Sequence, residues 1–194
     1  MNAVKILAIS DLHCYDISEL QSIGRYNFDL CVLCGDIPVK AIKIIKSIVK
    51  NKPVISVAGN HDNWNTPDLG GAENIHLKPY SFYGINMLGF GGSLRYKQGN
   101  YPMFTQQESL AALKNMPKAE ILISHDSMYR LFGNNNAHRG LMGITSYIFK
   151  NKVRLNICGH HHVSDVKHKF GCTVVCVYRC SLITYPDISV MNIF

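Results

Sequence analysis

The sequence predicts an α/β protein with parallel strands, and three observations lead to this expectation. Short apolar runs at residues 4–10, 30–35 and 53–59 have the length of buried strands. Apolar residues at helical spacing occupy residues 17–24 and 39–51, between these runs. Strands that alternate with helices usually lie parallel, because each helix returns the chain to the same end of the sheet.

The middle of the chain continues with strands and helices. Residues 82–92 are expected to form paired strands that turn at Gly84. Thr105 and Glu108 have the spacing of a capping box, which predicts a helix over residues 106–115. A strand at residues 119–124, a helix at residues 140–151 and a strand at residues 154–159 are expected to follow.

The last part of the chain has a different character. Residues 163–170, 172–180 and 187–194 have the pattern of consecutive strands with little between them. We therefore expect an α/β front and a β meander at the rear. The apolar residues 189–194 are expected to pack in the core rather than against another subunit.

Length and composition favour one globular domain covering residues 1–194. With 47% hydrophobic and 17% charged residues, the chain can bury a core without disulfides. No apolar run approaches the ~20 residues that span a bilayer. Lys5 interrupts the short N-terminal apolar run, which argues against a signal peptide. We expect a cytoplasmic protein that does not enter the membrane, and the sequence does not indicate an oligomeric state.

The cysteines are typical of reduced thiols in a cytosolic protein. The chain has seven, an odd number, and several lie inside apolar runs. Cys31 and Cys34 form a C-x-x-C, which is either a redox or zinc pair or part of the core. The second interpretation is favoured, because no second C-x-x-C partners the pair and it lies within a predicted strand.

The chain is basic, with a formal net charge of +7. Such a protein attracts anions, including nucleotides and nucleic acids. Lys40, Lys43, Lys46 and Lys50 recur at helical spacing, which favours a solvated helix face over a nucleic-acid patch. A second basic stretch covers residues 139–169 and surrounds a tract of three histidines.

Polar side chains recur where the predicted strands end. Five strand ends carry the letters SDLH, CGD, AGNHD, ISHD and CGHHH. The carboxyl edge of an open α/β sheet is where ligands bind, so we expect these side chains to gather there. Each has an ordinary explanation alone, such as a cap, a turn or a core histidine. Five clusters at one edge instead indicate one site, formed by Asp11, His13, Asp36, Asn60, His61, His125, His160 and His162.

These residue types suit a site for two metal ions. Imidazole nitrogen combined with carboxylate and amide oxygen fits divalent Mn, Fe, Co, Ni or Zn. Cysteine is absent from the motif positions, which disfavours a structural zinc site. Asp36 is a candidate bridge between two ions, because it follows Gly35, where the backbone can turn sharply. In an extended segment, His160 and His162 would both point into the site and His161 would point away.

These motifs resemble the signature of the calcineurin-like metallophosphoesterases, D-x-H, G-D, G-N-H-D, H and G-H-x-H. The blocks occur in the family's order at residues 11–13, 35–36, 59–62, 125 and 159–162. A match of five ordered blocks is far more specific than a lone motif. The stretch at residues 138–162 is similar to the small class-III-like phosphodiesterase branch, in which a helix precedes the last block. One departure is Asp126, which follows the fourth-block histidine where some members have a proline-rich turn.

The resemblance implies a four-layer α-β-β-α sandwich with two mixed β-sheets and a centre of two divalent cations. By similarity, one cation would be held by Asp11, His13, Asp36 and His162. The other would be held by Asp36, Asn60, His125 and His160. Manganese is the expected metal, with iron, zinc, nickel and cobalt as alternatives.

The resemblance also implies hydrolysis of a phosphoester. Hydroxide formed from water between the two cations would attack phosphorus in line, and His61 would assist the leaving oxygen. Asp62 either orients His61 or is only a polar neighbour. Arg95, His138 and Arg139 either contact the substrate phosphate or are exposed loop residues. The expected substrate is a phosphodiester, or a phosphomonoester, of a small molecule or nucleotide.

Two other functions remain open at this point. A nuclease with the same metal chemistry would make use of the positive charge, although no basic platform with interleaved aromatic residues is evident. A non-catalytic interaction module on the same fold is expected to have lost ligands, whereas every ligand position and His61 are present here.

Overall fold

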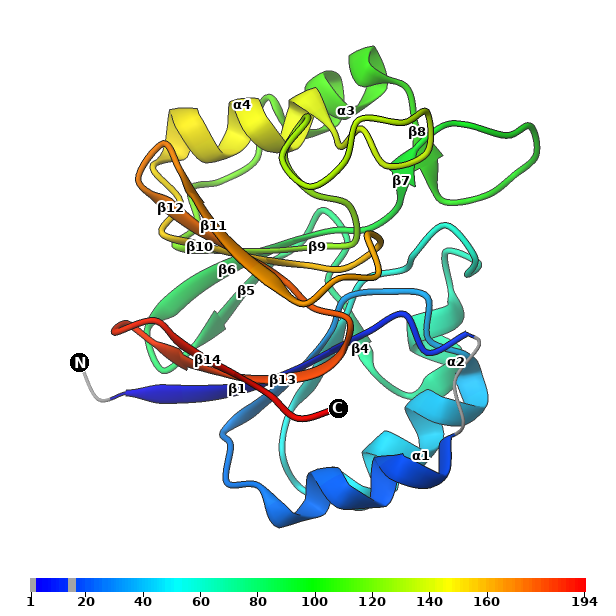
Figure 1. Cartoon of the computed structure of the whole chain (residues 1–194), viewed down its shortest axis with the longest axis vertical. Helices are drawn as coiled ribbons and strands as arrows, with labels where there is room; N and C mark the ends of the chain where they lie inside the picture. The colour runs from blue at the N-terminus through cyan, green and yellow to red at the C-terminus, as the bar shows by residue number, and fades with distance from the viewer. Residues whose placement is uncertain (1–2, 14–16) are drawn as a thin grey trace.

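The computed structural model describes residues 3–13 and 17–194 and has four layers (Figure 1). Two sheets lie face to face in the middle. The 3-10 helix η1 (Ile17–Arg25) and helices α1 (Val39–Val49) and α2 (Thr66–Gly70) cover the outer face of the first sheet. Helices α3 (Gln106–Leu113) and α4 (Met142–Asn151) cover the second. The expected α-β-β-α sandwich is confirmed.

The first sheet has the strand order β14-β13-β1-β2-β3-β4. Its strands are β1 (Val4–Ser10), β2 (Leu30–Leu33), β3 (Val54–Ser56), β4 (Glu73–Asn74), β13 (Arg179–Tyr185) and β14 (Ser189–Asn192). The strands β1 to β4 run parallel, as the alternation of strands and helices predicts. The strands β13 and β14 pair antiparallel, so the sheet is mixed.

The second sheet has the order β11-β12-β10-β9-β6-β5 and is also mixed. Its strands are β5 (Pro79–Phe82), β6 (Ile85–Phe90), β9 (Ile121–Ser124), β10 (Leu155–Cys158), β11 (Asp165–Lys169) and β12 (Cys172–Cys176). The hairpin of β5 and β6 turns at residues 83–84, as expected. The short strands β7 (Ser93–Leu94) and β8 (Met103–Phe104) pair parallel and form a separate two-stranded sheet.

The expected C-terminal meander is wrong. Strands β11 and β12 form a hairpin in the second sheet, and the chain then crosses to the first sheet, where β13 and β14 pair. The predicted strand over residues 172–180 therefore runs through this crossing. The sequence hides the break, because Val177, the first residue after β12, is as apolar and as buried as the strand residues before it.

The core between the sheets takes side chains from both of them. Ile6 and Val32 from the first sheet pack with Ile123 and Ile157 from the second. Cys34 belongs to this core, whereas Cys31 faces the layer of α1. Because the two thiols lie on opposite faces of one strand, they pack in the core and do not form a redox pair.

The remaining sequence expectations concern thiols and surface charge. The six cysteines among the described residues are free and buried, and Cys14 lies outside the described part of the chain. On α1, Lys40 and Lys43 are exposed while Ala41, Ile42 and Ile45 are buried, which agrees with a solvated lysine face. None of the helices among the described residues is long and apolar enough to cross a membrane.

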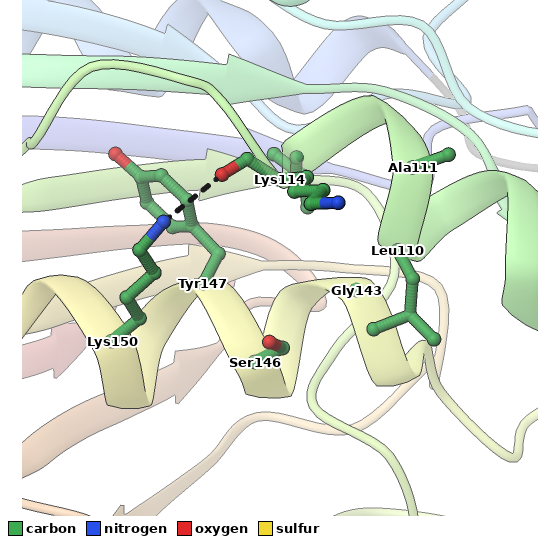
Figure 2. A pocket seen from close by; sticks show the side chains of 8 residues that line it. Leu110, Ala111, Lys114, Gly143, Ser146, Tyr147 and Lys150 are labelled. Carbon is green, nitrogen blue, oxygen red and sulfur yellow. Dashed lines mark hydrogen bonds between the residues drawn. The ribbon is translucent and has the colours of Figure 1, made fainter.

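The outer helices α3 and α4 pack closely because a glycine lies between them. A Cβ atom on Gly143 would overlap the backbone carbonyl of Ser109 on α3. Instead, the Gly143 amide donates a hydrogen bond of 3.1 Å to the Ser109 hydroxyl. At the other end of the contact, Lys150 Nζ donates to the Lys114 carbonyl at 3.2 Å (Figure 2).

We expect Gly143→Ala to lower the free energy of unfolding by roughly 1–3 kcal/mol, because the added methyl group overpacks the contact with α3. This loss should outweigh the gain from the higher helix propensity of alanine, which is at most about 1 kcal/mol because Gly143 lies in the first turn of α4. Urea denaturation of chelator-treated protein measures the difference. Ser146→Ala, at an exposed position of the same helix, is the control and should change the value by less than about 0.5 kcal/mol. Equal urea midpoints for Gly143→Ala and the wild type would refute the packing argument.

Candidate metal centre

Backbone hydrogen bonds join neighbouring strand ends within each sheet. The amides of Asp11 and Leu12, after β1, donate to the carbonyls of Gly35 and Asp36, after β2, at 3.1 and 2.9 Å. In the other sheet, Gly159 N donates to the His125 carbonyl at 2.9 Å. Together with the bond of 2.9 Å from the His160 amide to Asp11 Oδ2, which links the two sheets, these bonds bring the predicted polar clusters into one region, as expected for the carboxyl edges of parallel strands.

Two glycines allow this convergence. A Cβ atom on Gly159 would overlap the Ser10 hydroxyl, and one on Gly59 would overlap the carboxylate of Asp36. The loops that carry the polar clusters can therefore approach one another only where side chains are missing. This requirement explains why a glycine precedes both the histidine tract and Asn60.

Four of the predicted ligands have a left-handed backbone. Their φ angles are 58° for Asp11, 55° for Asp36, 69° for His160 and 52° for His162. Residues other than glycine rarely adopt this conformation, and it is retained where the surroundings impose it. The expectation that residues 160–162 are extended is therefore wrong, since two of the three have a positive φ. Alternation along a strand cannot explain how these histidines are oriented.

The solvent-facing part of the candidate centre contains Asp11, His13 and His162. Nitrogen and oxygen atoms of these three side chains lie close enough to hold one metal ion. Oδ1 of Asp11 lies 3.5 Å from His162 Nε2. Oδ2 of Asp11 accepts a hydrogen bond of 2.9 Å from the His160 amide, which fixes the carboxylate.

Asp36 lies at the centre of the arrangement. Its Oδ2 is 3.9 Å from His13 Nδ1 and 3.5 Å from His125 Nε2, so one carboxylate oxygen faces both predicted ligand sets. Its Oδ1 accepts a hydrogen bond of 2.7 Å from the His61 amide. Burial alone would raise the pKa of Asp36, but His125 and the His61 amide hold it well below its ordinary value. Asp36 is therefore an anion that faces His13 on one side and His125 on the other.

His125 is oriented by a carbonyl on its outer side. Its Nδ1 lies 2.7 Å from the Cys34 carbonyl oxygen and donates to it, which leaves Nε2 facing inward. There Nε2 is 2.9 Å from Asn60 Oδ1 and 3.5 Å from Asp36 Oδ2. Burial opposes charge on this ring, but the carboxylates of Asp36 and Asp11 outweigh it and raise the pKa of His125 to about 10.

Asn60 is oriented by a tyrosine that the sequence analysis did not identify. Its Nδ2 donates a hydrogen bond of 3.0 Å to the hydroxyl of Tyr96. This bond directs the carbonyl oxygen of the amide toward His125 and Asp36. No motif marks Tyr96, so only the fold reveals its contact with the site.

His160 lies beside His125, with 5.0 Å between the ring centroids. Its Nε2 donates to the Ala137 carbonyl at 2.8 Å, which leaves Nδ1 as the nitrogen with a free lone pair. Burial lowers the pKa of His160 to about 4. The ring is therefore neutral at neutral pH, which is the form that binds a metal.

His161, the middle histidine of the tract, has its own buried partners. Its side chain is only 3% exposed, and Nε2 lies 2.8 Å from the Ser127 hydroxyl and 3.3 Å from Asp126 Oδ1. Asp126 is fully buried and also accepts hydrogen bonds from the amides of Ser127 and Leu94. The residue that departs from the family pattern thus ties three loops together behind the candidate ligands.

The two predicted catalytic residues occupy different environments. The side chain of His61 is 46% exposed, stacks on His13 at 4.7 Å and has Nε2 4.0 Å from Asp36 Oδ2. Asp62 instead accepts hydrogen bonds of 2.8 Å from the amides of Gly59 and Asp36 through Oδ2. Burial raises the pKa of Asp62 to about 7. The observed contacts of Asp62 therefore join two loops.

The three predicted substrate residues lie close to the candidate ligands or to each other. The His138 ring is 4.9 Å from the His160 ring, and its Nδ1 contacts Asn135 Oδ1 at 3.1 Å. Arg95 and Arg139 line one cavity. Arg95 pairs with Glu108 at 2.9 Å, and Arg139 Nη2 donates to Asn136 Oδ1 at 3.2 Å.

The side chains of the centre fit divalent cations. Oδ1 of Asp11 and Nδ1 of His13 are buried and have no hydrogen-bond partner among the described residues. Nε2 of His125, which is hydrogen-bonded to Asn60 Oδ1 in the protein alone, would release its proton to become a ligand. Oxygen and nitrogen atoms that converge and accept no hydrogen bond can instead bind a cation. This mixture of nitrogen and oxygen ligands is typical of transition-metal sites.

Comparison with known proteins agrees with the fold and the motifs. A family model described as the calcineurin-like phosphoesterase superfamily domain matches residues 4–177. A curated relative, the uncharacterized protein MJ1162 of Methanocaldococcus jannaschii, is 29% identical over 189 residues, which cover 89% of this chain and 86% of that protein.

Solved structures of low sequence identity share the fold. TT1561 of Thermus thermophilus has a TM-score of 0.64 at 17% identity, covering 98% of this chain and 99% of that one. The phosphopantetheinyl hydrolase of Mycobacterium tuberculosis has a TM-score of 0.63 at 13% identity, covering 90% and 89%. A structure described as a novel archaeal phosphodiesterase has a TM-score of 0.55 at 13% identity, covering 97% and 98%.

The family model covers all five motif blocks, and each block lies at the convergent strand ends of a four-layer sandwich. The chain therefore belongs to the calcineurin-like phosphoesterase superfamily.

Proposed function

We propose that this phosphoesterase hydrolyses a phosphodiester of a small molecule or nucleotide with the help of two divalent cations, manganese first among them. The observation that carries the proposal is the position of Asp36, whose Oδ2 lies between His13 Nδ1 and His125 Nε2 at 3.9 and 3.5 Å. A carboxylate between two sets of ligands is the arrangement that a two-metal site requires. We also propose that the protein acts in the cytoplasm.

The proposed ligand sets differ in their access to solvent. Asp11, His13, Asp36 and His162 would hold one cation, and this set includes the more exposed imidazoles. Asp36, Asn60, His125 and His160 would hold the other, and all four are buried. When bound, the two cations supply activated water and neutralise charge on the phosphoryl oxygens. The substrate would approach from the exposed side, where His61 and His162 lie.

The proposed role of His61 is to stabilise or protonate the leaving oxygen. Its position suits this role, because the ring is half exposed and packs on His13 at the mouth of the centre. Its backbone amide is fixed by Asp36, so the ring stays close to the proposed bridge. Burial lowers the pKa of His61, with the opposite influence of Asp36 partly offsetting it. A general acid gains efficiency when its pKa lies near the working pH.

Asp62 and Asp126 are proposed as positioning residues. Asp62 fixes the loop of Asn60 against the loop of Asp36 through two amides. Asp126 fixes His161, which lies between the proposed ligands His160 and His162. Partners behind a ligand set its orientation and commonly affect metal affinity by about 10–100-fold when they are removed.

A diester is favoured over a monoester by two considerations. The stretch at residues 138–162 is similar to the small phosphodiesterase branch, and helix α4 does precede the histidine tract. One protein of similar fold is described as a phosphodiesterase, and another as a phosphopantetheinyl hydrolase.

The test of the proposed function compares bis-p-nitrophenyl phosphate with p-nitrophenyl phosphate. Chelator-stripped protein should be inactive, and added Mn²⁺ should restore hydrolysis with a higher kcat/KM for the diester. The liberated nitrophenolate is followed by absorbance. Absence of hydrolysis of both esters with every divalent metal tested would contradict the proposal, and preference for the monoester would contradict the diester assignment.

Asp36→Ala and His61→Ala should separate metal binding from turnover. Loss of Asp36 should reduce bound metal and lower kcat by at least about 100-fold, because the proposed bridge is gone. Loss of His61 should leave bound metal unchanged and lower kcat by roughly 10²–10⁴-fold. Metal content by plasma mass spectrometry and kcat are measured on the same samples. His168→Ala, an exposed histidine on β11, is the control. Metal loss in His61→Ala would show that its assigned role is wrong.

Asp126→Asn and His161→Gln should each weaken Mn²⁺ binding by roughly 10–100-fold, because the loop that carries His160 and His162 loses its support. If the two residues act through each other, the double variant should bind Mn²⁺ with about the same affinity as the single variant that binds it less tightly. Mn²⁺ affinity is measured by calorimetry, with circular dichroism to verify folding. Additive losses, or an unchanged affinity in Asp126→Asn, would rule out this positioning role.

A further inference from the structure

A cavity of about 410 Å³ is formed by the loops that follow β7 and β9. Its polar lining consists of Arg95, Arg139, Tyr96, Tyr129, Asn136 and Gln106. We refer to it as the Arg139 cavity. Among the described residues, two guanidinium groups and no carboxylate line it, so its charge is positive.

The Arg139 cavity adjoins the candidate metal centre through two hydrogen bonds. The hydroxyl of Tyr96, in the cavity wall, accepts from Asn60 Nδ2 at 3.0 Å. On the other side, the Ala137 carbonyl accepts from His160 Nε2 at 2.8 Å, and Asn136 next to it lines the cavity. The wall of the cavity therefore directly contacts the candidate ligand Asn60, and the residue next to Asn136 contacts the candidate ligand His160.

The two arginines differ in how their charges are satisfied. Arg95 Nη2 donates to the carboxylate of Glu108 at 2.9 Å and to the Met103 carbonyl at 3.2 Å. Glu108 belongs to the capping box of α3 and lies on the exposed side of Arg95. The charge of Arg95 is thus paired with a carboxylate of the protein itself.

The positive charge of Arg139 has no carboxylate partner among the described residues. Its side chain donates one observed hydrogen bond, of 3.2 Å, from Nη2 to Asn136 Oδ1. Its Nε atom is buried and makes no hydrogen bond within the described part of the chain, where no carboxylate lies within ion-pair distance either. A buried donor without a partner is costly, and the planar fork of a guanidinium matches the oxygens of a phosphate. Arg139 lines the cavity with its charge unpaired, so an anion bound there would balance that charge.

We propose that the Arg139 cavity binds a second phosphate of the substrate, so that the preferred substrate is a phosphodiester carrying a phosphate monoester on one arm. This inference rests on the proposed phosphodiesterase function. A phosphate monoester carries close to two negative charges at neutral pH, and the unpaired guanidinium of Arg139 would offset one of them. The hydroxyl of Tyr129 and the amides of Asn136 and Gln106 add hydrogen-bonding groups around it.

The test uses two substrates with the same leaving group. Thymidine 5′-(p-nitrophenyl phosphate) is compared with its 3′-phosphorylated form, using Mn²⁺-loaded protein. The wild type should have a KM at least about 10-fold lower for the 3′-phosphorylated ester. Arg139→Met should remove most of this difference, because it should raise the KM of the 3′-phosphorylated ester much more than that of the unphosphorylated ester.

A matched control and a binding measurement separate the cavity from general charge effects. Arg130→Met removes the same charge from an exposed neighbour outside the cavity and should leave the preference intact. Calorimetry with chelator-treated protein should show thymidine 3′,5′-bisphosphate binding at least about 10-fold more tightly than thymidine 5′-phosphate. Arg139→Met should abolish this preference, and Arg139→Lys should retain part of it.

The outcomes distinguish the two proposals. Equal KM values for the two esters, or equal losses in Arg139→Met and Arg130→Met, overturn the second-phosphate inference while leaving the phosphodiesterase proposal standing. Absence of metal-dependent hydrolysis of both esters overturns the phosphodiesterase proposal. In that case, a bisphosphate preference that depends on Arg139 in the chelator-treated protein still supports the cavity as a phosphate site.

Discussion

The arrangement depends on the burial of two carboxylates, Asp11 and Asp36, at the point where the two sheets meet. Asp11 is 4% exposed and Asp36 is 1% exposed. Charged groups are stable in such a place only when hydrogen bonds and positive charge surround them. The amides of His160 and His61 supply the hydrogen bonds, and His125 supplies the positive charge in the protein alone. The loops after every strand that reaches this edge therefore have to bring amides and imidazoles toward these two groups.

This requirement explains the local backbone of the motifs. Asp11 and Asp36 have left-handed conformations that turn each chain sharply after its strand. Gly59 and Gly159 lack the side chains that would push the loops away from the carboxylates. The motif letters consequently describe two kinds of residue, those that offer electron pairs and those that make room for them. Both kinds are needed for the donors to converge.

The sequence predicted the strands that lead into the site and the polar residues at their ends, because strand length and motif order are local properties. It did not predict how His160 and His162 are oriented, because the left-handed turns depend on the contact of residue 159 with Ser10. Tyr96 and the buried pair of Asp126 and His161 were not predicted either. Their partners lie 34–36 residues away in the chain, and no spacing rule connects them. The crossing after β12 was missed because Val177, its first residue, is apolar and buried like the strand residues before it.

The pairing of β1 has a consequence for the order of assembly during synthesis. Strand β1 lies between β2, which follows soon after it, and β13, which begins at residue 179. Until residues 179–185 have been made, β1 has one unpaired edge, and such edges attract other strands. The candidate centre also depends on residues that are far apart in the chain, because Asp11 Oδ2 accepts a hydrogen bond from the amide of His160, 149 positions later. Contacts of this range slow folding. The chain therefore completes the edge that carries the candidate ligands only after residue 160 has been made, and strand β1 keeps an unpaired edge until residues 179–185 follow.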